Sequence, residues 1–164
     1  MRNGAARRAA QWLALIVPLA LIGGALGSQY LGGLYPCEMC MWQRWPHYAA
    51  IAVALLSFVA LPARTPLIWL AALLIAASGA IGAFHAGVEY GWWEGLTRCA
   101  TTFGAGGGDT LDAIMNAPLI RCDVAPWQFM GISLAGWNAI LSLAGALVIA
   151  VLMLKRQVNR NCRK

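Results

Sequence analysis

The sequence contains four long stretches without a single Asp, Glu, Lys or Arg. They hold 29, 19, 24 and 31 residues and cover 9–37, 45–63, 65–88 and 124–154. A helix needs about 20 apolar residues to cross the hydrocarbon core of a bilayer, so each stretch fits one crossing and none fits two. Backbone groups in lipid must hydrogen-bond within their own segment, and we therefore expect each crossing to be a helix.

The composition agrees with this reading. The 164 residues are 60% hydrophobic and only 11% charged, whereas a soluble domain has roughly 25% charged residues. We predict an all-α membrane protein, a four-transmembrane-helix bundle that forms a single integral membrane domain over 1–164. The expected spans are 11–30, 45–62, 66–87 and 132–154, and the loops between them on one side are 31–44 and 88–131.

The first stretch has an alternative interpretation as a cleaved signal peptide. Arg2, Arg7 and Arg8 precede the apolar run, and the small residues at 25–27 resemble a cleavage site. The apolar run continues toward Leu34, past the length of a typical signal core. This continuation favours a membrane span.

Basic residues predict the orientation. Nine of the twelve Lys and Arg residues fall in the two tails and in the loop between the second and third expected spans, and all six acids fall on the opposite side. Because basic residues mark the cytoplasmic side, we expect both termini in the cytoplasm and the loops 31–44 and 88–131 outside. The net charge of +6 then reflects topology, and we expect no nucleic-acid partner.

Four of the five cysteines lie in the two outward loops, where disulfides persist. Cys37 and Cys40 form a Cys-x-x-Cys motif directly before the second span. At the N-terminus of a helix a thiolate is stabilised by unpaired backbone amides, and Arg44, one turn later, is expected to face Cys40 and lower its pKa. Cys162, in the cytoplasmic tail, is expected to be free and dispensable.

Other uses of the Cys-x-x-Cys motif stay open. A zinc site normally requires a second close pair or histidines, and the chain has only His47 and His85, so we expect no metal. Covalent haem attachment requires a histidine where this chain has Met41. A purely structural bridge is the remaining alternative.

Cys99 and Cys122 lie in the long second loop. Four glycines in five residues, at 104–108, separate them, and such a flexible interior favours a loop that moves during thiol exchange. A stabilising disulfide that closes this loop is the alternative. Asp109 is expected to cap a short interfacial helix that ends near Pro118.

Arg44 and His85 fall at the membrane depth of Cys40. A cation and a hydrogen-bonding ring beside a redox sulfur suit the carbonyl of a quinone, because they stabilise negative charge on its oxygen. Glu89, one turn beyond His85, can orient that ring or relay protons. The alternatives are that Arg44 reaches the headgroups and that His85 only ends its helix.

Taken together, these motifs resemble the DsbB family of bacterial inner-membrane disulfide-forming oxidoreductases. The resemblance rests on the order and spacing of four segments that cover nearly the whole chain. They are Pro36-Cys37-Glu38-Met39-Cys40 with Arg44, the segment Phe84-His85-Ala86-Gly87-Val88-Glu89, the Cys99 and Cys122 pair, and residues 127–133, WQFMGIS.

The resemblance implies a thiol oxidase that uses ubiquinone or menaquinone and reoxidises a periplasmic, thioredoxin-fold DsbA-like partner. Cys99 would then form the mixed disulfide with the partner, and Cys122 would resolve it. Cys37 would exchange with the loop pair, and Cys40 would contact the quinone near Arg44 and His85. The loops would be periplasmic and the membrane would be the bacterial inner membrane. The glycine-rich second loop leaves the particular partner open.

Two other functions were considered. The first is a non-enzymatic four-helix membrane scaffold whose loops are held by two structural disulfides. The second is a transporter or channel, which would require ionisable residues along a path through the membrane, and the expected span interiors contain none.

Overall fold

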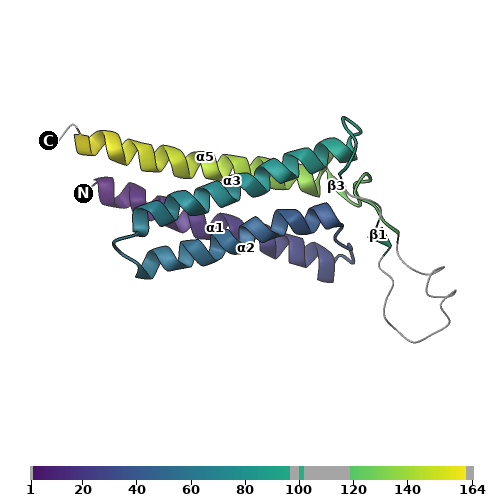
Figure 1. Cartoon of the computed structure of the whole chain (residues 1–164), viewed down its shortest axis with the longest axis horizontal. Coiled ribbons are helices and arrows are strands. Elements are labelled where there is room, and N and C mark those ends of the chain that lie inside the picture. Colours follow the sequence, from purple (N-terminus) through teal and green to yellow (C-terminus); the bar gives the residue numbers. More distant parts are fainter. Residues whose placement is uncertain (1, 97–99, 102–118, 162–164) are drawn as a thin grey trace.

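Four helices that run along a common axis form the body of the protein (Figure 1). The computed structural model describes the backbone of residues 2–96, 100–101 and 119–161, and the side chains of 4–96 and 121–155. The helices are α1 (Arg2–Tyr30), α2 (Glu38–Val59), α3 (Arg64–Glu89) and α5 (Leu134–Asn161). Helix α1 begins and α5 ends at the same end of the bundle (Figure 1).

The helices are packed in a ring. Helix α1 contacts α2, α2 contacts α3, α3 contacts α5, and α5 returns to α1. Within the described residues, α1, α3 and α5 are long and apolar enough to cross a membrane. Helix α2 is long enough but less apolar than the other three, because its first half carries polar side chains. The predicted four helices are confirmed, and the membrane crossing of α2 stays a prediction.

Two short hairpins lie at the end of the bundle opposite the termini. Strand β1 (Ala100–Thr101) pairs with β2 (Leu119–Ile120), and β3 (Gln128–Phe129) pairs with β4 (Ile132–Ser133), both antiparallel. Met130 and Gly131 form the two-residue turn between β3 and β4 and have φ angles of 53° and 77°. Positive φ at both positions suits the twist of a tight hairpin. The hairpin leads the chain directly into α5.

Helix α2 begins earlier than the predicted span 45–62. It starts at Glu38 and ends at Val59, so half of the predicted loop 31–44 is helical. The predicted span 45–62 would put Pro46 in the first helical turn, and this was wrong, since Pro46 lies in the interior of α2. Cys37 is the N-cap, and its sulfur accepts a hydrogen bond from the backbone N–H of Cys40. This cap satisfies a backbone amide at the helix start and allows α2 to begin there.

The other helices also differ in length from the expected spans. Helix α1 includes the basic tail that precedes 11–30, α3 extends slightly beyond 66–87 at both ends, and α5 begins after β4 and continues past 154. The predicted interfacial helix and the four glycines at 104–108 lie outside the described residues, as do Cys99 and Cys162.

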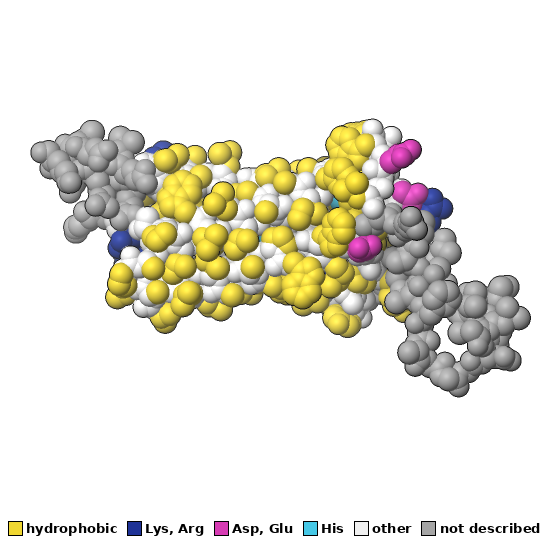
Figure 2. Space-filling model, in the orientation of Figure 1, with side chains coloured by type: hydrophobic (Ala, Val, Ile, Leu, Met, Phe, Trp, Pro, Cys, Tyr) yellow, Lys and Arg dark blue, Asp and Glu magenta, His cyan; other side chains and the backbone are white. Residues whose placement is uncertain are grey.

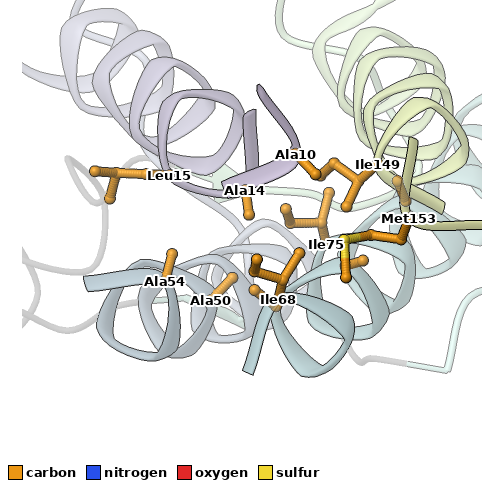
Figure 3. Close-up of a cluster of buried hydrophobic side chains, with 12 residues drawn as sticks. Ala10, Ala14, Leu15, Ala50, Ala54, Ile68, Ile75, Ile149 and Met153 are labelled. Atoms are coloured by element: carbon orange, nitrogen blue, oxygen red, sulfur yellow. The ribbon is translucent and has the colours of Figure 1, made fainter. Parts of the chain in front are cut away.

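Small side chains fill much of the helix interfaces. A buried cluster at the half of the bundle nearer the termini combines alanines with a few larger side chains (Figure 3): Ala10, Ala14, Leu15, Ala50, Ala54, Ile68, Ile75, Ile149 and Met153. Without water to drive their association, membrane helices gain stability from close packing, which small residues permit. A buried pair, Gln11 Nε2 donating to Ser57 Oγ at 3.0 Å, joins α1 to α2 in this region.

The surface agrees with a membrane environment. Apolar side chains cover the visible flank between the two ends, whereas the visible acidic side chains gather at the end that carries the hairpins (Figure 2). The hairpin end also holds exposed aromatic residues, including Trp92, Trp93 and Trp127, the residue type that anchors at the headgroup level.

Helices α3 and α5 approach most closely at glycines of α3. A Cβ atom added at Gly82 would lie 2.9 Å from Asn138 Nδ2, 3.0 Å from the Ala135 carbonyl oxygen and 3.1 Å from Gln43 Oε1. We predict that Gly82→Ala destabilises the protein by on the order of 1–3 kcal/mol, because the methyl group overpacks the interface. Thermal unfolding in detergent measures this effect.

Gly23→Ala is the matched control. Gly23 lies in helix α1 with nothing within 4 Å of an added Cβ atom. Alanine there is expected to leave stability unchanged or raise it by about 0.5–1 kcal/mol. Equal effects of the two substitutions would contradict the close contact of α3 with α5.

Candidate active site

Cys37 and Cys40 form the start of helix α2. Their sulfur atoms lie 3.0 Å apart, with the Cys37 thiol donating to Cys40, and the backbone N–H of Cys40 donates to the Cys37 sulfur at 3.3 Å. Both cysteines and Cys122 are free thiols, as far as the described residues go. Residues three apart share a helix face, so a Cys-x-x-Cys motif at a helix start brings its two sulfurs together.

The two sulfurs have different surroundings. Cys37 is buried against Met39 and Val88. Its hydrogen bond to Cys40 and then its burial raise the pKa of the Cys37 thiol, so that Cys37 keeps its proton and donates it toward Cys40. Cys40 lies in the first turn of α2, where the helix dipole stabilises a thiolate.

Cys122 lies beside this pair. It packs against the cluster of Cys37, Met39 and Val88, and it contributes to the raised pKa of the Cys37 thiol. A cysteine from the segment between α3 and α5 therefore packs against the buried cysteine of the Cys-x-x-Cys motif. This contact suits thiol–disulfide exchange between the two loops.

His85 and Glu89 approach the sulfurs from the end of α3. His85 Nε2 lies 3.6 Å from the Cys37 sulfur and 3.8 Å from Glu89 Oε1. The predicted neighbourhood of His85, Glu89 and the Cys-x-x-Cys motif is therefore present in the structure.

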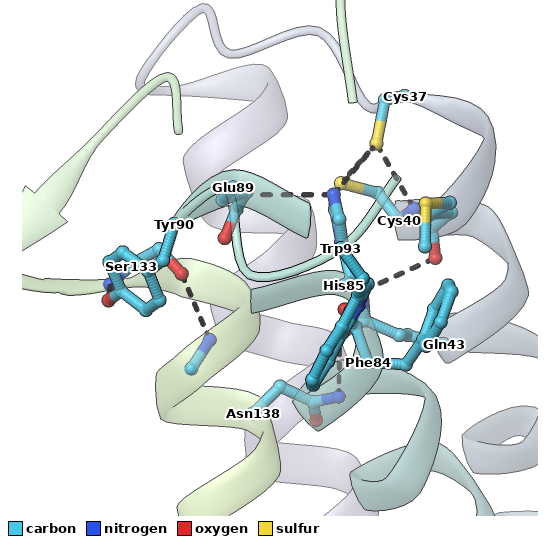
Figure 4. A network of polar contacts seen from close by, with 12 residues as sticks. Cys37, Cys40, Gln43, Phe84, His85, Glu89, Tyr90, Trp93, Ser133 and Asn138 are labelled. Atoms are coloured by element: carbon cyan, nitrogen blue, oxygen red, sulfur yellow. Dashed lines mark hydrogen bonds and ion pairs between the residues drawn. The ribbon is translucent and has the colours of Figure 1, made fainter. Parts of the chain in front are cut away.

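A buried polar network holds His85 in place (Figure 4). Gln43 Nε2 lies 2.8 Å from His85 Nδ1 and 3.2 Å from the Met39 carbonyl oxygen, and Asn138 Nδ2 donates to Gln43 Oε1 at 2.8 Å. Ser78 Oγ donates to the Gln43 carbonyl oxygen at 2.8 Å. The network joins α2, α3 and α5 beneath the sulfurs. The sequence analysis missed Gln43 and Asn138. Gln43 lies beside Arg44 in the predicted loop 31–44 and gave no signal, whereas Asn138 is a polar residue within an apolar stretch.

The network also determines which His85 nitrogen carries hydrogen. A carbonyl oxygen only accepts hydrogen bonds, so the contact with Met39 identifies the Gln43 atom facing it as the amide nitrogen, a donor. His85 Nδ1 must then accept from the same nitrogen, and in the neutral ring Nε2 bears the hydrogen. That N–H faces the Cys37 sulfur.

This tautomer bears on the zinc alternative. The side chains of Cys37, Cys40 and His85 offer three ligand atoms that all lie within 4.8 Å of one another. Metal binding through Nε2 requires a lone pair on that nitrogen and a hydrogen on Nδ1 that points to an acceptor. Gln43 presents a donor to Nδ1, so the surroundings of His85 favour a hydrogen bond to sulfur over a metal ligand.

Arg44 points toward α1. Its side chain is 8% exposed, with Nη1 donating to Gln29 Oε1 at 2.6 Å and Nη2 donating to the Ala25 carbonyl oxygen at 3.2 Å. Arg44 lines the same cavity as Cys40, and no hydrogen bond joins it to the Cys40 sulfur among the described contacts, so its role beside that sulfur stays a prediction.

Two cavities meet at Cys40. The loop-side cavity has a volume of about 500 Å³ and is lined by Cys37, Cys40, His85 and Glu89. Residues from the segment before α2 and from the segment before α5, including Arg121, complete its lining. The membrane-side cavity, of about 300 Å³, lies between α1, α2 and α5 and is lined by Cys40, Gln43, Arg44, His47 and Asn138 together with mostly apolar side chains.

Among the described residues, Cys40 is therefore the one whose sulfur-bearing side chain lines both cavities, and Arg44 and His85 line different ones. Fold and site together define a helical membrane protein that carries a buried dithiol between a loop-side and a membrane-side cavity.

Comparison with known proteins agrees with this class. Residues 7–152 match the family model described as "Disulfide bond formation protein DsbB", so the chain belongs to the DsbB family. It is 27% identical over 158 residues to "Disulfide bond formation protein B" of Nitrosomonas europaea, with 90% of this chain and 93% of that protein covered. It is 32% identical to the protein of the same name from Polaromonas sp., with coverage of 82% and 83%.

A third relative is "Disulfide bond formation protein B 1" of Pseudomonas putida, which is 30% identical with 91% of this chain and 88% of that protein covered. No solved structure matches the chain. Family membership makes this protein a disulfide-forming oxidoreductase.

The surroundings of the Cys-x-x-Cys motif predict unequal thiol reactivity. Because the pKa of Cys37 is raised, it should remain protonated above the usual cysteine value of about 8.5. At neutral pH an alkylating reagent should then modify Cys40 first. Mass spectrometry of the reduced protein after timed alkylation across a pH series measures both rates.

Cys40→Ala separates pKa from accessibility. Removing the Cys40 sulfur removes the largest cause of the raised pKa of Cys37, so the alkylation profile of Cys37 should move to lower pH. A Cys37 profile that is unchanged in the variant, or equal rates at neutral pH in the parent, would contradict this arrangement.

Proposed function

We propose that the protein oxidises a periplasmic DsbA-like dithiol protein and passes the electrons to a membrane quinone. The observation that carries this proposal is the position of Cys40, which forms part of the wall of both the loop-side and the membrane-side cavity. A dithiol in that position can receive electrons from one cavity and deliver them to the other.

The loop side suits the exchange steps. In the proposed sequence, a thiolate of the partner attacks a Cys99–Cys122 disulfide at Cys99, and the released Cys122 attacks Cys37 of a Cys37–Cys40 disulfide. Cys122 already contacts Cys37, and the leaving sulfur is Cys40, at the positive end of α2. Exchange is faster when the leaving thiolate is stabilised. The second partner thiol then attacks the mixed disulfide and releases Cys99 as a thiolate. Cys99 attacks Cys122 of the Cys122–Cys37 disulfide, which re-forms the Cys99–Cys122 disulfide and leaves Cys37 and Cys40 as thiols.

The membrane side fits a quinone headgroup. Small-molecule sites are concave and mostly apolar, with a few polar groups that fix orientation, and this cavity combines an apolar lining with Arg44 and His47. Its His47 Nδ1 is buried and lacks a hydrogen-bond partner among the described residues. A bound ubiquinone or menaquinone would accept the two electrons and two protons that the Cys37–Cys40 dithiol releases on becoming a disulfide.

Residues of this chain support that final transfer. Arg44 is held by Gln29 and Ala25, so its fixed positive charge can stabilise negative charge on a ligand oxygen near Cys40. His85 directs its Nε2–H toward the Cys37 sulfur, and Glu89 Oε1 lies 3.8 Å from the same nitrogen. This hydrogen bond stabilises charge on Cys37 as its proton leaves.

The energetics require a strong electron acceptor. A DsbA-type dithiol has a reduction potential near about −120 mV, and about 30 mV corresponds to 1.4 kcal/mol for two electrons. Couples in the glutathione range lie below this value and would not reoxidise such a partner. A membrane quinone therefore suits the reaction better than a soluble thiol.

We also propose the topology. All four helices cross the bacterial inner membrane, with both termini cytoplasmic and the loops periplasmic. The shared end of α1 and α5, the acidic side chains at the other end and the excess of basic residues in the tails support this orientation. In this arrangement 1–164 forms one membrane domain.

Two cysteine variants test the function. Cys40→Ser should abolish reduction of a short-chain ubiquinone by a reduced DsbA-like protein, because the sulfur shared by the two cavities is lost. Cys122→Ser should accumulate a mixed disulfide when the partner is supplied in its oxidised form, because the Cys99 thiol attacks the partner's disulfide and no Cys122 sulfur remains to displace the partner. Ubiquinone absorbance and non-reducing electrophoresis measure the two results.

Cys162→Ser is the control and is expected to retain full activity. Undiminished quinone reduction by Cys40→Ser would contradict the proposal. Inert behaviour of the parent protein toward both the dithiol protein and the quinone would instead favour the scaffold with two structural disulfides.

A further inference from the structure

His47 is a buried histidine on the membrane-side cavity. It is 2% exposed, lies two turns along α2 from Cys40, and lines the same cavity as Cys40 and Arg44. The proposed thiol–disulfide exchange does not use His47, and the proposed charge stabilisation is assigned to Arg44 alone.

The orientation of Asn138 determines the state of His47. Asn138 Nδ2 lies 2.8 Å from Gln43 Oε1, 3.3 Å from the Ser78 carbonyl oxygen and 3.2 Å from Ser78 Oγ. The carbonyl oxygen only accepts, and Ser78 Oγ already gives its hydrogen to the Gln43 carbonyl oxygen. The atom of Asn138 that faces Ser78 and Gln43 is therefore the amide nitrogen.

Asn138 Oδ1 consequently faces His47. It lies 3.0 Å from His47 Nε2 and 3.0 Å from Ser142 Oγ. Because Oδ1 is an acceptor, Nε2 must carry the hydrogen, and in the neutral ring Nδ1 then bears a lone pair. That Nδ1 is buried and has no hydrogen-bond partner among the described residues.

A buried acceptor without a hydrogen-bond partner is unfavourable, because it has lost its contact with water and gained nothing in exchange. An oxidised quinone cannot relieve this, since both of its oxygens are acceptors. A hydroquinone carries two hydroxyl groups and can donate to Nδ1. Arg44, on the same cavity, is a donor only and suits the opposite kind of oxygen.

We propose that His47 Nδ1 accepts a hydrogen bond from a hydroxyl group of the hydroquinone, so that the membrane-side cavity binds the reduced form more tightly than the oxidised form. This inference rests on the proposed function, since it assigns a ligand contact within the same quinone site. It makes His47 a binding residue for the product of the final transfer, held in the required tautomer by Asn138 and Ser78.

Two substitutions separate the roles of the two ring nitrogens. In His47→Gln the side-chain amide can replace Nε2 and keep the bond to Asn138, but no acceptor remains at Nδ1. In His47→Asn an acceptor remains near the Nδ1 position, but the side chain is too short to reach Asn138. A shared Cys40→Ser background prevents electron exchange during the measurement.

The experiment measures dissociation constants of a short-chain ubiquinone and its ubiquinol, anaerobically, by quenching of tryptophan fluorescence. His47→Gln should weaken ubiquinol binding about tenfold, or 1.4 kcal/mol, and ubiquinone binding by less than about twofold. His47→Asn should keep ubiquinol affinity within about threefold of the parent. Equal loss of both forms, or no loss, in His47→Gln would overturn the assignment.

Nitrogen NMR of histidine-labelled protein gives a second readout that requires no substitution at His47. Nδ1 should be unprotonated without ligand and should shift on addition of ubiquinol. A protonated Nδ1 in the free neutral protein would overturn the inference. If neither ubiquinone nor ubiquinol binds the parent, the proposed function itself fails, whereas binding that is independent of His47 rejects only the present inference.

Discussion

The need to satisfy polar groups inside an apolar bundle determines how the site is built. Gln43 lies among helices α2, α3 and α5, where an unpaired amide would be strongly unfavourable. Its contacts with Met39, His85 and Asn138 satisfy it, and they also fix how the three helices meet near the sulfurs. The hydrogen bonds that satisfy the Gln43 amide thus orient His85. Asn138, which donates to Gln43, orients His47 in turn through the hydrogen bond between Asn138 Oδ1 and His47 Nε2.

Through this network, the redox sulfurs and the membrane-side cavity become parts of one arrangement. Cys40, Gln43, Arg44 and His47 follow one another at helical spacing, yet they serve different neighbours. Gln43 faces α3 and α5, and Arg44 faces α1. Cys40 lies one helical turn before these two residues and lines both cavities. Two turns of α2 therefore join the loop-side cavity, where we propose thiol exchange, to the membrane-side cavity, where we propose the electron acceptor.

Much of this arrangement could be predicted from the sequence. Uncharged stretches located the helices, since hydropathy reports membrane depth, and depth alone was enough to place His85 near Cys37 and Cys40. Hydropathy does not report which side of a helix faces which neighbour. For this reason the sequence did not show that Arg44 and His85 line two different cavities. The contacts of Asn138 with Gln43 link residues 95 positions apart, and only the packed structure shows them. The start of α2 at Glu38 was missed because the predicted span began at 45, after the last charged residue, Arg44.

The central claim is that an electron acceptor lies in the cavity between α1, α2 and α5, on the membrane side of Cys40. Photolabelling of the protein in membranes with an azido-ubiquinone, followed by peptide mass spectrometry, tests this claim most directly. Labels should fall on the α1 and α5 walls of that cavity, near Ala25 and Trp137. Labels confined to the loop-side cavity, near Tyr35 and Val124, would contradict the account.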